Sequence, residues 1–313
     1  MTNKKRLIFL FCTFSVVIVL FFMACKNQET NPDKLEETIL QGATTILVDE
    51  SVQPIVEDEV AVFESQYNAK IKLINKPESE VINDLISDKA KIAILSRKLN
   101  TEEEKVFINR KLSPKITEFA IDAITLITNK NAKDTLVDLQ EVINLLQGKV
   151  SKIQGLVFEN PNSSTVNYMN NLAGVGKEAK KNVFSLQSNE EVLKYVAEND
   201  GMIGVVGLNL IVQPPSKIQL YLEKVKVLGV RNVKSQPNSD AYYKPSQSNI
   251  GAGLYPLERK LYMLNYQGKE GLGMGFASYI AGEIGQRIIL KSGLLPVRIP
   301  SRIIQLRKEI EKK

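Results

Sequence analysis

The side chains best suited to chemistry in this sequence are hydroxyl, amide and guanidinium donors placed just after short apolar segments. Ser51 follows the apolar run 45–48, and Ser96 with Arg97 follows the run that ends at Leu95. Where a strand leads into a helix, a hydroxyl and the N–H groups of the first helical turn bind anions. An arginine fork suits an oxyanion in particular. These segments therefore predict anion-binding loops.

A further loop is the densest donor cluster in the chain. It follows the apolar segment 155–158 and precedes a helical stretch. Its residues are Asn162, Ser163, Ser164 and Thr165. Three hydroxyls beside consecutive N–H groups at a strand-to-helix turn form an anion nest. If two such loops face each other across a cleft, neutral donors supply most of the contacts to an oxyanion.

Each of these loops also has a purely structural interpretation, which the sequence leaves open. Ser51 and the hydroxyls of 162–165 are equally suited to cap a helix. Arg97 is equally suited to a surface ion pair with Glu102 or Glu103. The sequence by itself does not separate these interpretations.

The composition favours binding over catalysis. Histidine is absent, which removes the commonest general base and the Ser-His-Asp system. The two cysteines lie in the first 25 residues, so the folded body has neither cysteine nor histidine for a zinc site. Asp49, Glu50 and Glu159 are the candidates for an enzyme using paired carboxylates, but their spacing matches no catalytic pattern. We therefore expect no enzyme activity, no cofactor and no metal.

The N-terminus indicates an exported lipoprotein. Lys4, Lys5 and Arg6 precede the apolar run 7–23, and a small residue precedes Cys25. This is the pattern of a secretory signal peptide, here 1–24, with Cys25 as the lipidated first residue of the mature chain. The alternative is an uncleaved membrane anchor, for which the run is at the lower limit of the roughly 20 apolar residues required. We expect a protein of the cell envelope, lipid-anchored to the membrane and facing the periplasm.

The remaining charge does not specify a nucleic-acid partner. Residues 25–41 are polar and predict a flexible tether. Without the signal peptide the chain has 38 basic and 35 acidic residues, a net charge of +3. The basic residues after 297 are interleaved with Glu309 and Glu311 and indicate a solvated helix face.

Short strands alternate with helices along the body, which predicts a mostly parallel α/β sheet. The predicted strands are 45–48, 69–73, 91–95, 118–128, 155–158, 201–206 and 260–266. The predicted helices are 55–63, 79–87, a helix opening at Thr101, 136–146, 190–198 and 274–291. For the helix at Thr101 we expect a capping box formed with Glu104. Ligands of such sheets lie at the carboxyl ends of the strands.

Two lobes are expected because the body exceeds the usual size of a single core. The long apolar strand 118–128 is interpreted as the first crossing between lobes, and the irregular segment 233–253 leads back. The predicted organisation is lobe 1 in 42–125, lobe 2 in 126–249, and the rest of lobe 1 with a C-terminal helix in 250–313. A ligand cleft would lie between the lobes.

Four segments resemble the PstS-like phosphate-binding proteins of ABC transporters, which have a two-lobed type II periplasmic binding protein fold. The most specific are YPLERKLYML at 255–264 and GLGMGFASYIAGEIGQRIILKSGLLP at 271–296. DGMIGVVG at 200–207 and LSRKLNTEEE at 95–104 add support. The resemblance covers the chain from Gly42 to Pro296.

The resemblance implies that Ser51, Ser96 and the 163–165 loop contact the ligand while the lobes close over it. It also implies delivery of the ligand to a membrane permease. Where the family has an arginine, an aspartate and Gly-Ser-Gly-Thr, this chain has Glu159, Pro161 and Asn-Ser-Ser-Thr. We hypothesise that Arg97 supplies the positive charge missing at Glu159.

The sequence thus predicts a monomeric solute-binding lipoprotein for inorganic phosphate or a related oxyanion, with an ABC permease as partner. The alternative is a sensory or structural lipoprotein that keeps the fold with an altered site.

Overall fold

The computed structural model describes residues 37–176, 178 and 180–301. The predicted signal peptide, Cys25 and the basic residues from Arg302 onward lie outside the described residues. Glu37 contacts the folded body, because its carboxylate accepts hydrogen bonds from Lys269 Nζ at 2.9 Å and from the Leu272 N–H at 3.1 Å. The last residues of the predicted tether therefore pack against the body.

Strand β4 (Lys115–Asn129) connects two hydrophobic cores. Phe119 and Ala120 belong to one core, whereas Ala123 and Ile124 belong to the other. The predicted strand 118–128 is present and is longer than predicted. We call the half built on the first core lobe 1 and the half built on the second core lobe 2.

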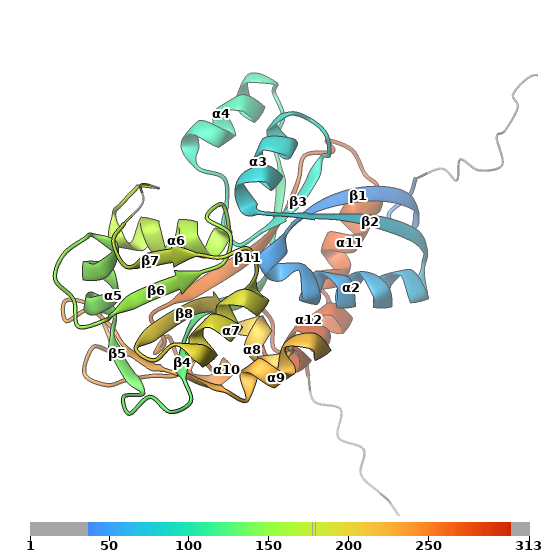
Figure 1. The fold of residues 1–313 in the computed structure, drawn as a ribbon. Coiled ribbons are helices and arrows are strands. Elements are labelled where there is room, and N and C mark those ends of the chain that lie inside the picture. The colour runs from blue at the N-terminus through green and yellow to red at the C-terminus, as the bar shows by residue number, and fades with distance from the viewer. Residues whose placement is uncertain (1–36, 177, 179, 302–313) are drawn as a thin grey trace, which may run out of the picture. The chain divides into compact units, whose positions relative to one another are not determined.

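Lobe 1 combines the first and the last part of the described chain. Figure 1 shows the blue N-terminal elements beside the red C-terminal helices. Its elements are β1 (Gln41–Asp49), η1 (Glu50–Val52), α2 (Gln53–Gln66), β2 (Asn68–Lys76), α3 (Glu78–Ile86), β3 (Ile92–Leu95), α4 (Thr101–Asn109), β11 (Glu258–Asn265), α11 (Leu272–Ile280), α12 (Glu283–Lys291) and β12 (Leu295–Pro296).

Lobe 2 is formed by the middle of the chain. Its elements are β5 (Leu136–Asp138), α5 (Leu139–Leu146), β6 (Gly155–Phe158), α6 (Ser164–Ala173), β7 (Val183–Ser185), α7 (Asn189–Glu198), β8 (Met202–Gly207), α8 (Leu208–Val212), η2 (Ser216–Ile218), α9 (Gln219–Leu222), β9 (Val225–Val227), β10 (Gly229–Arg231) and α10 (Gln247–Gly251).

The main sheet runs through both lobes in the order β2-β1-β3-β11-β4-β8-β6-β7. The strands β1, β2 and β3 are parallel, and so are β6, β7 and β8, while β11 and β4 are antiparallel to their neighbours. β9 and β12 also pair with β4, and β5 pairs with β10 in a separate small sheet. The fold is the predicted α/β type, but the sheet is mixed rather than mostly parallel, because β4 and β11 run antiparallel to their neighbours.

Helices cover both faces of the sheet in lobe 1, as the side-chain alternation of β1 requires. Ile46 and Val48 pack in the core that contains Phe63 and Phe276. Leu47, which points to the opposite face, packs in a separate core with Phe107. The site described below lies where the strands of the two lobes end toward one another.

Two helix predictions are wrong in their limits. The segment 136–146 begins with strand β5, because Leu136–Asp138 pairs with β10, some 90 residues later in the chain. The segment 274–291 forms two helices that are separated at Gly282, which adopts an extended conformation with ψ 177°. The amide of Gln286 donates at 2.8 Å to the carbonyls of Ile280 and Phe119, and so binds a carbonyl at the end of α11.

Candidate functional site

A buried ion pair joins the two strands that connect the lobes. Asp122 of β4 lies directly opposite Arg259 of β11 in the antiparallel ladder, and directly opposite residues are within reach of each other. Arg259 Nε donates to Asp122 Oδ2 at 2.8 Å, and Nη2 lies 2.7 Å from the same oxygen. Both side chains are 1% exposed. Nη2 has no acceptor in hydrogen-bond geometry, and no donor reaches Asp122 Oδ1 in hydrogen-bond geometry.

A chain of hydrogen bonds leads from this arginine to lobe 1. Arg259 Nη1 donates to Ser164 Oγ at 3.0 Å, and Ser164 Oγ lies 2.9 Å from Ser51 Oγ. Ser51 Oγ donates in turn to Asp49 Oδ2 at 3.0 Å. A hydroxyl has one proton, so the proton between the two serines is donated by Ser164. The chain is therefore polarised from the cation toward the carboxylate of Asp49.

The local structure around Ser51 explains its position. The chain leaves β1 at Asp49, whose Oδ1 accepts the Ser51 N–H at 3.1 Å and caps η1. Asn209, in α8 of lobe 2, donates from Nδ2 to the Ser51 carbonyl at 2.8 Å. The predicted residue Ser51 thus contacts lobe 2 through both its hydroxyl and its backbone.

The predicted donor loop forms the start of α6. Ser163 is the N-cap, and its hydroxyl accepts the Val166 N–H at 3.3 Å. Ser163, Ser164 and Thr165 are all buried, whereas Asn162 is exposed. The Asn162 carbonyl accepts a hydrogen bond from the Ser79 N–H of lobe 1 at 3.4 Å. The N-cap interpretation is correct for Ser163, while Ser164 points to the ion pair.

Glu159 is a buried acid beside this turn, with 3% of the residue exposed. Thr165 Oγ1 donates to its Oε1 at 3.2 Å. Burial, together with the negative charges of Glu50 and Asp49, raises the pKa of Glu159 to about 7, although Arg259 and Thr165 act in the opposite direction. We call the following residues the interlobe cluster: Asp49, Ser51, Asp122, Glu159, Ser164, Thr165, Asn209 and Arg259.

Arg97 lies at the edge of this region and is engaged by lobe 1. Its Nε donates to Glu78 at 2.9 Å, and its Nη atoms donate to Glu103 at 2.8 and 2.9 Å. Nη1 also donates to the Lys98 carbonyl at 2.9 Å. Four of its five N–H groups therefore have partners. The ion-pair interpretation with Glu103 is correct, and the guanidinium inside the interlobe cluster belongs to Arg259.

The carboxylate of Glu78 connects Arg97 to lobe 2. Asn167 of α6 donates from Nδ2 to Glu78 Oε1 at 3.0 Å, the same oxygen that Arg97 binds. A cleft of about 240 Å³ lies beside this contact. Its lining residues are Glu78, Ser96, Arg97, Ser164, Tyr168, Asn171 and Leu172. Three predicted site residues, Ser96, Arg97 and Ser164, thus line one cleft between the lobes.

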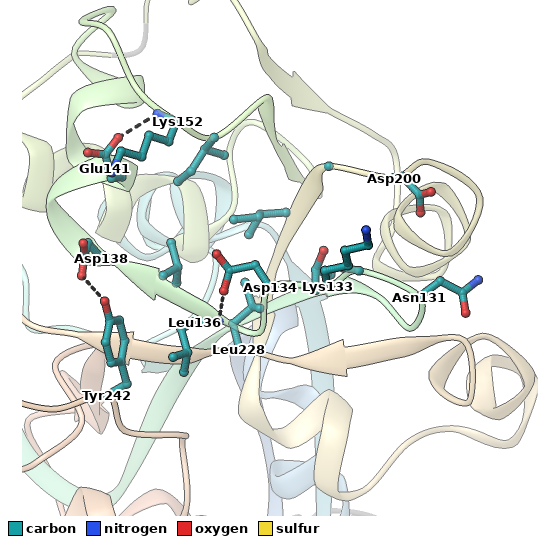
Figure 2. A pocket seen from close by; sticks show the side chains of 16 residues that line it. Asn131, Lys133, Asp134, Leu136, Asp138, Glu141, Lys152, Asp200, Leu228 and Tyr242 are labelled. Carbon is teal, nitrogen blue, oxygen red and sulfur yellow. Dashed lines mark hydrogen bonds between the residues drawn. The ribbon is translucent and has the colours of Figure 1, made fainter.

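A larger cavity of about 680 Å³ lies within lobe 2, away from these residues. Figure 2 shows its polar side chains, among them Lys133, Asp134 and Asp200. Asp138 in its wall is paired with Arg231 and accepts from the Tyr242 hydroxyl at 2.9 Å. The residues that line this cavity come from β4 and lobe 2, so polar groups of the two lobes do not face each other there. Its size therefore does not make it the better candidate for the site.

Within the described residues, no group of acidic side chains is arranged to hold a metal ion. No helix in that part of the chain is both long enough and apolar enough to span a membrane.

A family model described as the PBP superfamily domain matches residues 35–283. The chain belongs to the PBP superfamily. A curated PBP relative, the phosphate-binding protein PstS of Borreliella burgdorferi, is 25% identical over 307 residues, which is 90% of this chain and 99% of that protein.

Solved structures with similar chains have the same fold. One from Clostridium perfringens, described as a phosphate ABC transporter substrate-binding protein with bound phosphate, has a TM-score of 0.66 at 20% identity and covers 82% of this chain and 100% of that chain. An ABC-type phosphate transport receptor from Vibrio cholerae has a TM-score of 0.63 at 17% identity, with 82% and 100% covered. The two-lobed PBP fold predicted from the sequence is confirmed.

The sequence interpretation missed Asp122, Arg259 and Asn209. A signal was present for Asp122, which interrupts the apolar strand EFAIDAITLIT, whereas Arg259 stands between two other charged residues, Glu258 and Lys260. A charged residue inside a buried strand requires a partner. The two strands were not predicted to pair in this register, so the partnership was not recognised. Asn209 carries no comparable signal.

Proposed function

We propose that the chain binds inorganic phosphate or a related oxyanion in the interlobe cluster and delivers it to a membrane permease. The observation that supports this best is the position of Ser164. Its hydroxyl accepts a hydrogen bond from buried Arg259 and also forms a hydrogen bond with Ser51 of lobe 1. A cation, two hydroxyls and a helix N-terminus converge there, and all of these favour an oxyanion. The names of the PstS relative and of the Clostridium perfringens structure point to phosphate.

The proposed ligand contacts combine the predicted loops with the buried arginine. In this proposal the ligand separates Ser51 from Ser164, and both hydroxyls then turn toward it. The proposed contact residues are Ser51, Ser96, Asn162, Ser163, Ser164, Thr165 and Arg259, with Arg97 at the edge of the cleft. Hydrogen bonds to a charged ligand contribute about 1.5–3 kcal/mol each. Several such bonds are sufficient for micromolar binding.

Lobe closure would be the functional event, and no covalent chemistry is involved. The bound form presents the two lobes in a fixed arrangement that a permease recognises. We further propose a monomer anchored through lipidated Cys25 and facing the periplasm. Its partners are the oxyanion, an ABC permease and the membrane.

The second candidate is a sensory or structural lipoprotein without transport. It is favoured by the direct bonds between the lobes, such as Asn209 to Ser51 and Asn167 to Glu78. It is also favoured by the acids Asp49, Asp122 and Glu159 around Arg259, because they disfavour an anion. A ligand titration separates the two candidates.

The test is isothermal titration of the soluble body 26–313, stripped of bound ligand, with phosphate and then with sulfate. Micromolar or tighter binding of phosphate with little binding of sulfate is the expected result. Arg259→Gln should abolish the heat, while Lys133→Gln in the larger cavity of lobe 2 serves as the matched control and should bind like the natural protein. The absence of heat and of thermal stabilisation with both anions would contradict the proposal and favour the second candidate.

A further inference from the structure

Glu159 has no part in the hydrogen-bond chain of the proposed site, although it lies beside it. It follows β6 directly and precedes the turn that carries Ser163 and Ser164. Its contact with Thr165 holds the carboxyl against the first turn of α6. The carboxyl is buried, so water does not screen its charge from a ligand in the cluster.

The charged groups that face Glu159 come from three elements. Asp49 ends β1, Glu50 belongs to η1, and both add negative charge. Arg259 of β11 is the facing cation, but its ion pair with Asp122 neutralises much of its charge. Thr165 of α6 is the neutral donor. An oxyanion placed among these groups would therefore meet ionised carboxylates and one cation that is already paired.

We propose that the protonation state of Glu159 determines whether the site binds an oxyanion. Glu159 takes up a proton from solvent when the anion binds, and its carboxylic acid then donates a hydrogen bond to the ligand. This proposal rests on the proposed oxyanion-binding function and deepens it. One O–H bond forms at Glu159, the proton comes from bulk water or buffer, and the ligand is not altered chemically.

The physical reason is the repulsion between two anions in one buried site. An ionised Glu159 and a bound oxyanion disfavour each other, whereas the protonated acid supplies a donor in place of a repelling charge. The raised pKa of Glu159, about 7 before the ligand binds, means that the proton is available near neutral pH. Binding of an anion raises this pKa further.

The consequence is that affinity falls as the pH rises. Below pH 7 most molecules carry the acid and are competent to bind. Above it, the competent fraction decreases about tenfold for each pH unit, and the apparent affinity decreases with it. Release of the ligand would be favoured on the more alkaline side.

The test compares the natural protein with Glu159→Gln, because glutamine keeps the shape and supplies a permanent neutral donor. Full-length protein in detergent is titrated with inorganic phosphate between pH 5.5 and 8.5. Phosphate itself titrates in this range, but it does so equally for every variant, so the ratio of the two affinities isolates Glu159. With a pKa of about 7, Glu159→Gln should bind about 30-fold more tightly than the natural protein at pH 8.5 and about equally at pH 5.5.

Glu258→Gln is the matched control. Glu258 is an exposed acid next to Arg259, and its neutralisation changes the net charge by the same amount. Its affinity ratio to the natural protein should stay within about twofold at each pH, since exposed charges are screened.

A second measurement does not depend on the variant being folded. Titration of the natural protein with phosphate at pH 8, in buffers that differ in ionisation enthalpy, counts the protons taken up on binding. We expect close to one proton more than the change in protonation of phosphate itself explains. No extra proton, or coincident pH profiles for the natural protein and Glu159→Gln, would overturn this inference while leaving the proposed function in place. Absence of phosphate binding by all variants at every pH would overturn both.

Discussion

Arg97 and Arg259 lie at the same interlobe boundary but in opposite physical situations. The Arg97 side chain is 30% exposed and is bound by two carboxylates and a carbonyl, all from lobe 1. Arg259 is 1% exposed and has Asp122 on one side and the hydroxyl of Ser164 from lobe 2 on the other. An arginine beside a cleft is therefore a candidate ligand-binding residue only when its N–H groups are not already bound by carboxylates of its own lobe.

The acids beside the two arginines differ in the same way. Burial raises the pKa of Glu103, but hydrogen bonds from Arg97 and the Asn100 N–H outweigh it and hold the pKa below its usual value. Burial raises the pKa of Glu159, and no strong partner compensates. The first pair therefore stabilises the fold locally, whereas the second region contains charges that are not fully compensated. Such groups are characteristic of binding sites.

The strongest test of the comparison is Arg259→Met. Removal of one partner of a buried ion pair leaves the charge of Asp122 uncompensated, and the free energy of unfolding should decrease by about 3–5 kcal/mol. Oxyanion binding should be lost. Urea denaturation measures the first effect and titration calorimetry the second.

A double variant distinguishes the two roles of Arg259. Arg259→Met combined with Asp122→Leu removes both charges, and apolar replacement of a whole buried pair is often neutral for stability. We expect most of the lost stability to return while binding remains absent. Recovery of binding in the double variant would show that Arg259 serves only to neutralise Asp122.

The second test uses the pH dependence of stability. Because the folded-state pKa of Glu159 is raised from 4.5 to about 7, the folded protein holds this proton more strongly than the unfolded chain. The protonated Glu159 carboxyl therefore contributes to the free energy of unfolding at acid pH. This contribution, up to about 3 kcal/mol, is lost as the pH rises from about 4.5 through 7.

Relative to the natural protein, Glu159→Gln should therefore gain stability between pH 5 and pH 8, as followed by urea denaturation at each pH. Glu103→Gln is the comparison from the other arginine. The pKa of Glu103 is lowered, so its contribution is present above the ordinary carboxyl pKa and is lost as the pH falls. Glu103→Gln should therefore change little relative to the natural protein between pH 5 and pH 8. A gain equal to that of Glu159→Gln would contradict the assignment of the two environments.

The third test separates two adjacent serines. Ser164→Ala removes the hydroxyl that meets Arg259 and Ser51, and affinity for the oxyanion should decrease by one to two orders of magnitude, equivalent to about 1.5–3 kcal/mol. Ser163→Ala removes the cap of α6 and should decrease the free energy of unfolding by about 1 kcal/mol. It should decrease the affinity less than Ser164→Ala does, because the Ser163 hydroxyl is engaged by the Val166 N–H. Calorimetry and urea denaturation applied to both variants measure these effects. Equal loss of affinity in both would argue against a special role for Ser164.

The smallest effect on oxyanion affinity is expected for Arg97→Ala. Glu103 keeps its capping contacts with Asn100, and Glu78 keeps the hydrogen bond from Asn167. We expect less than a tenfold loss of phosphate affinity by calorimetry, together with a loss of stability, because the Glu78 side chain is 2% exposed and loses its cation. A larger loss of affinity than in Ser164→Ala would restore the hypothesis that Arg97 supplies the positive charge.

Local patterns predicted the longer elements of this fold and the limits of some of them. The strand 155–158 was predicted with its observed limits, and the helix 190–198 within one residue. The capping box was predicted one residue too late, because Asn100 is the N-cap and the Glu103 side chain accepts the Asn100 N–H. The same Glu103 also binds Arg97. Sequence spacing alone does not distinguish Asn100 from Thr101, since both have side chains that cap helices.

The candidate site could be predicted only in part. Ser51 and Ser164 were found because a hydroxyl at a strand-to-helix turn has a local signature. Arg259 was missed because its role depends on its register opposite Asp122, 137 residues away in the chain. Register is set by the pairing of whole strands and is not visible in either segment alone.

The sequence by itself determined the α/β class and the position of the donor loops, because these depend on residue type and short-range periodicity. The tertiary structure decided which charges face each other. It placed Arg259 inside the interlobe cluster, held Arg97 against Glu103, and surrounded Glu159 with acids from β1 and η1. Electrostatic interactions act through space and are strengthened by burial, so neither partner nor burial can be read from the order of residues along the chain.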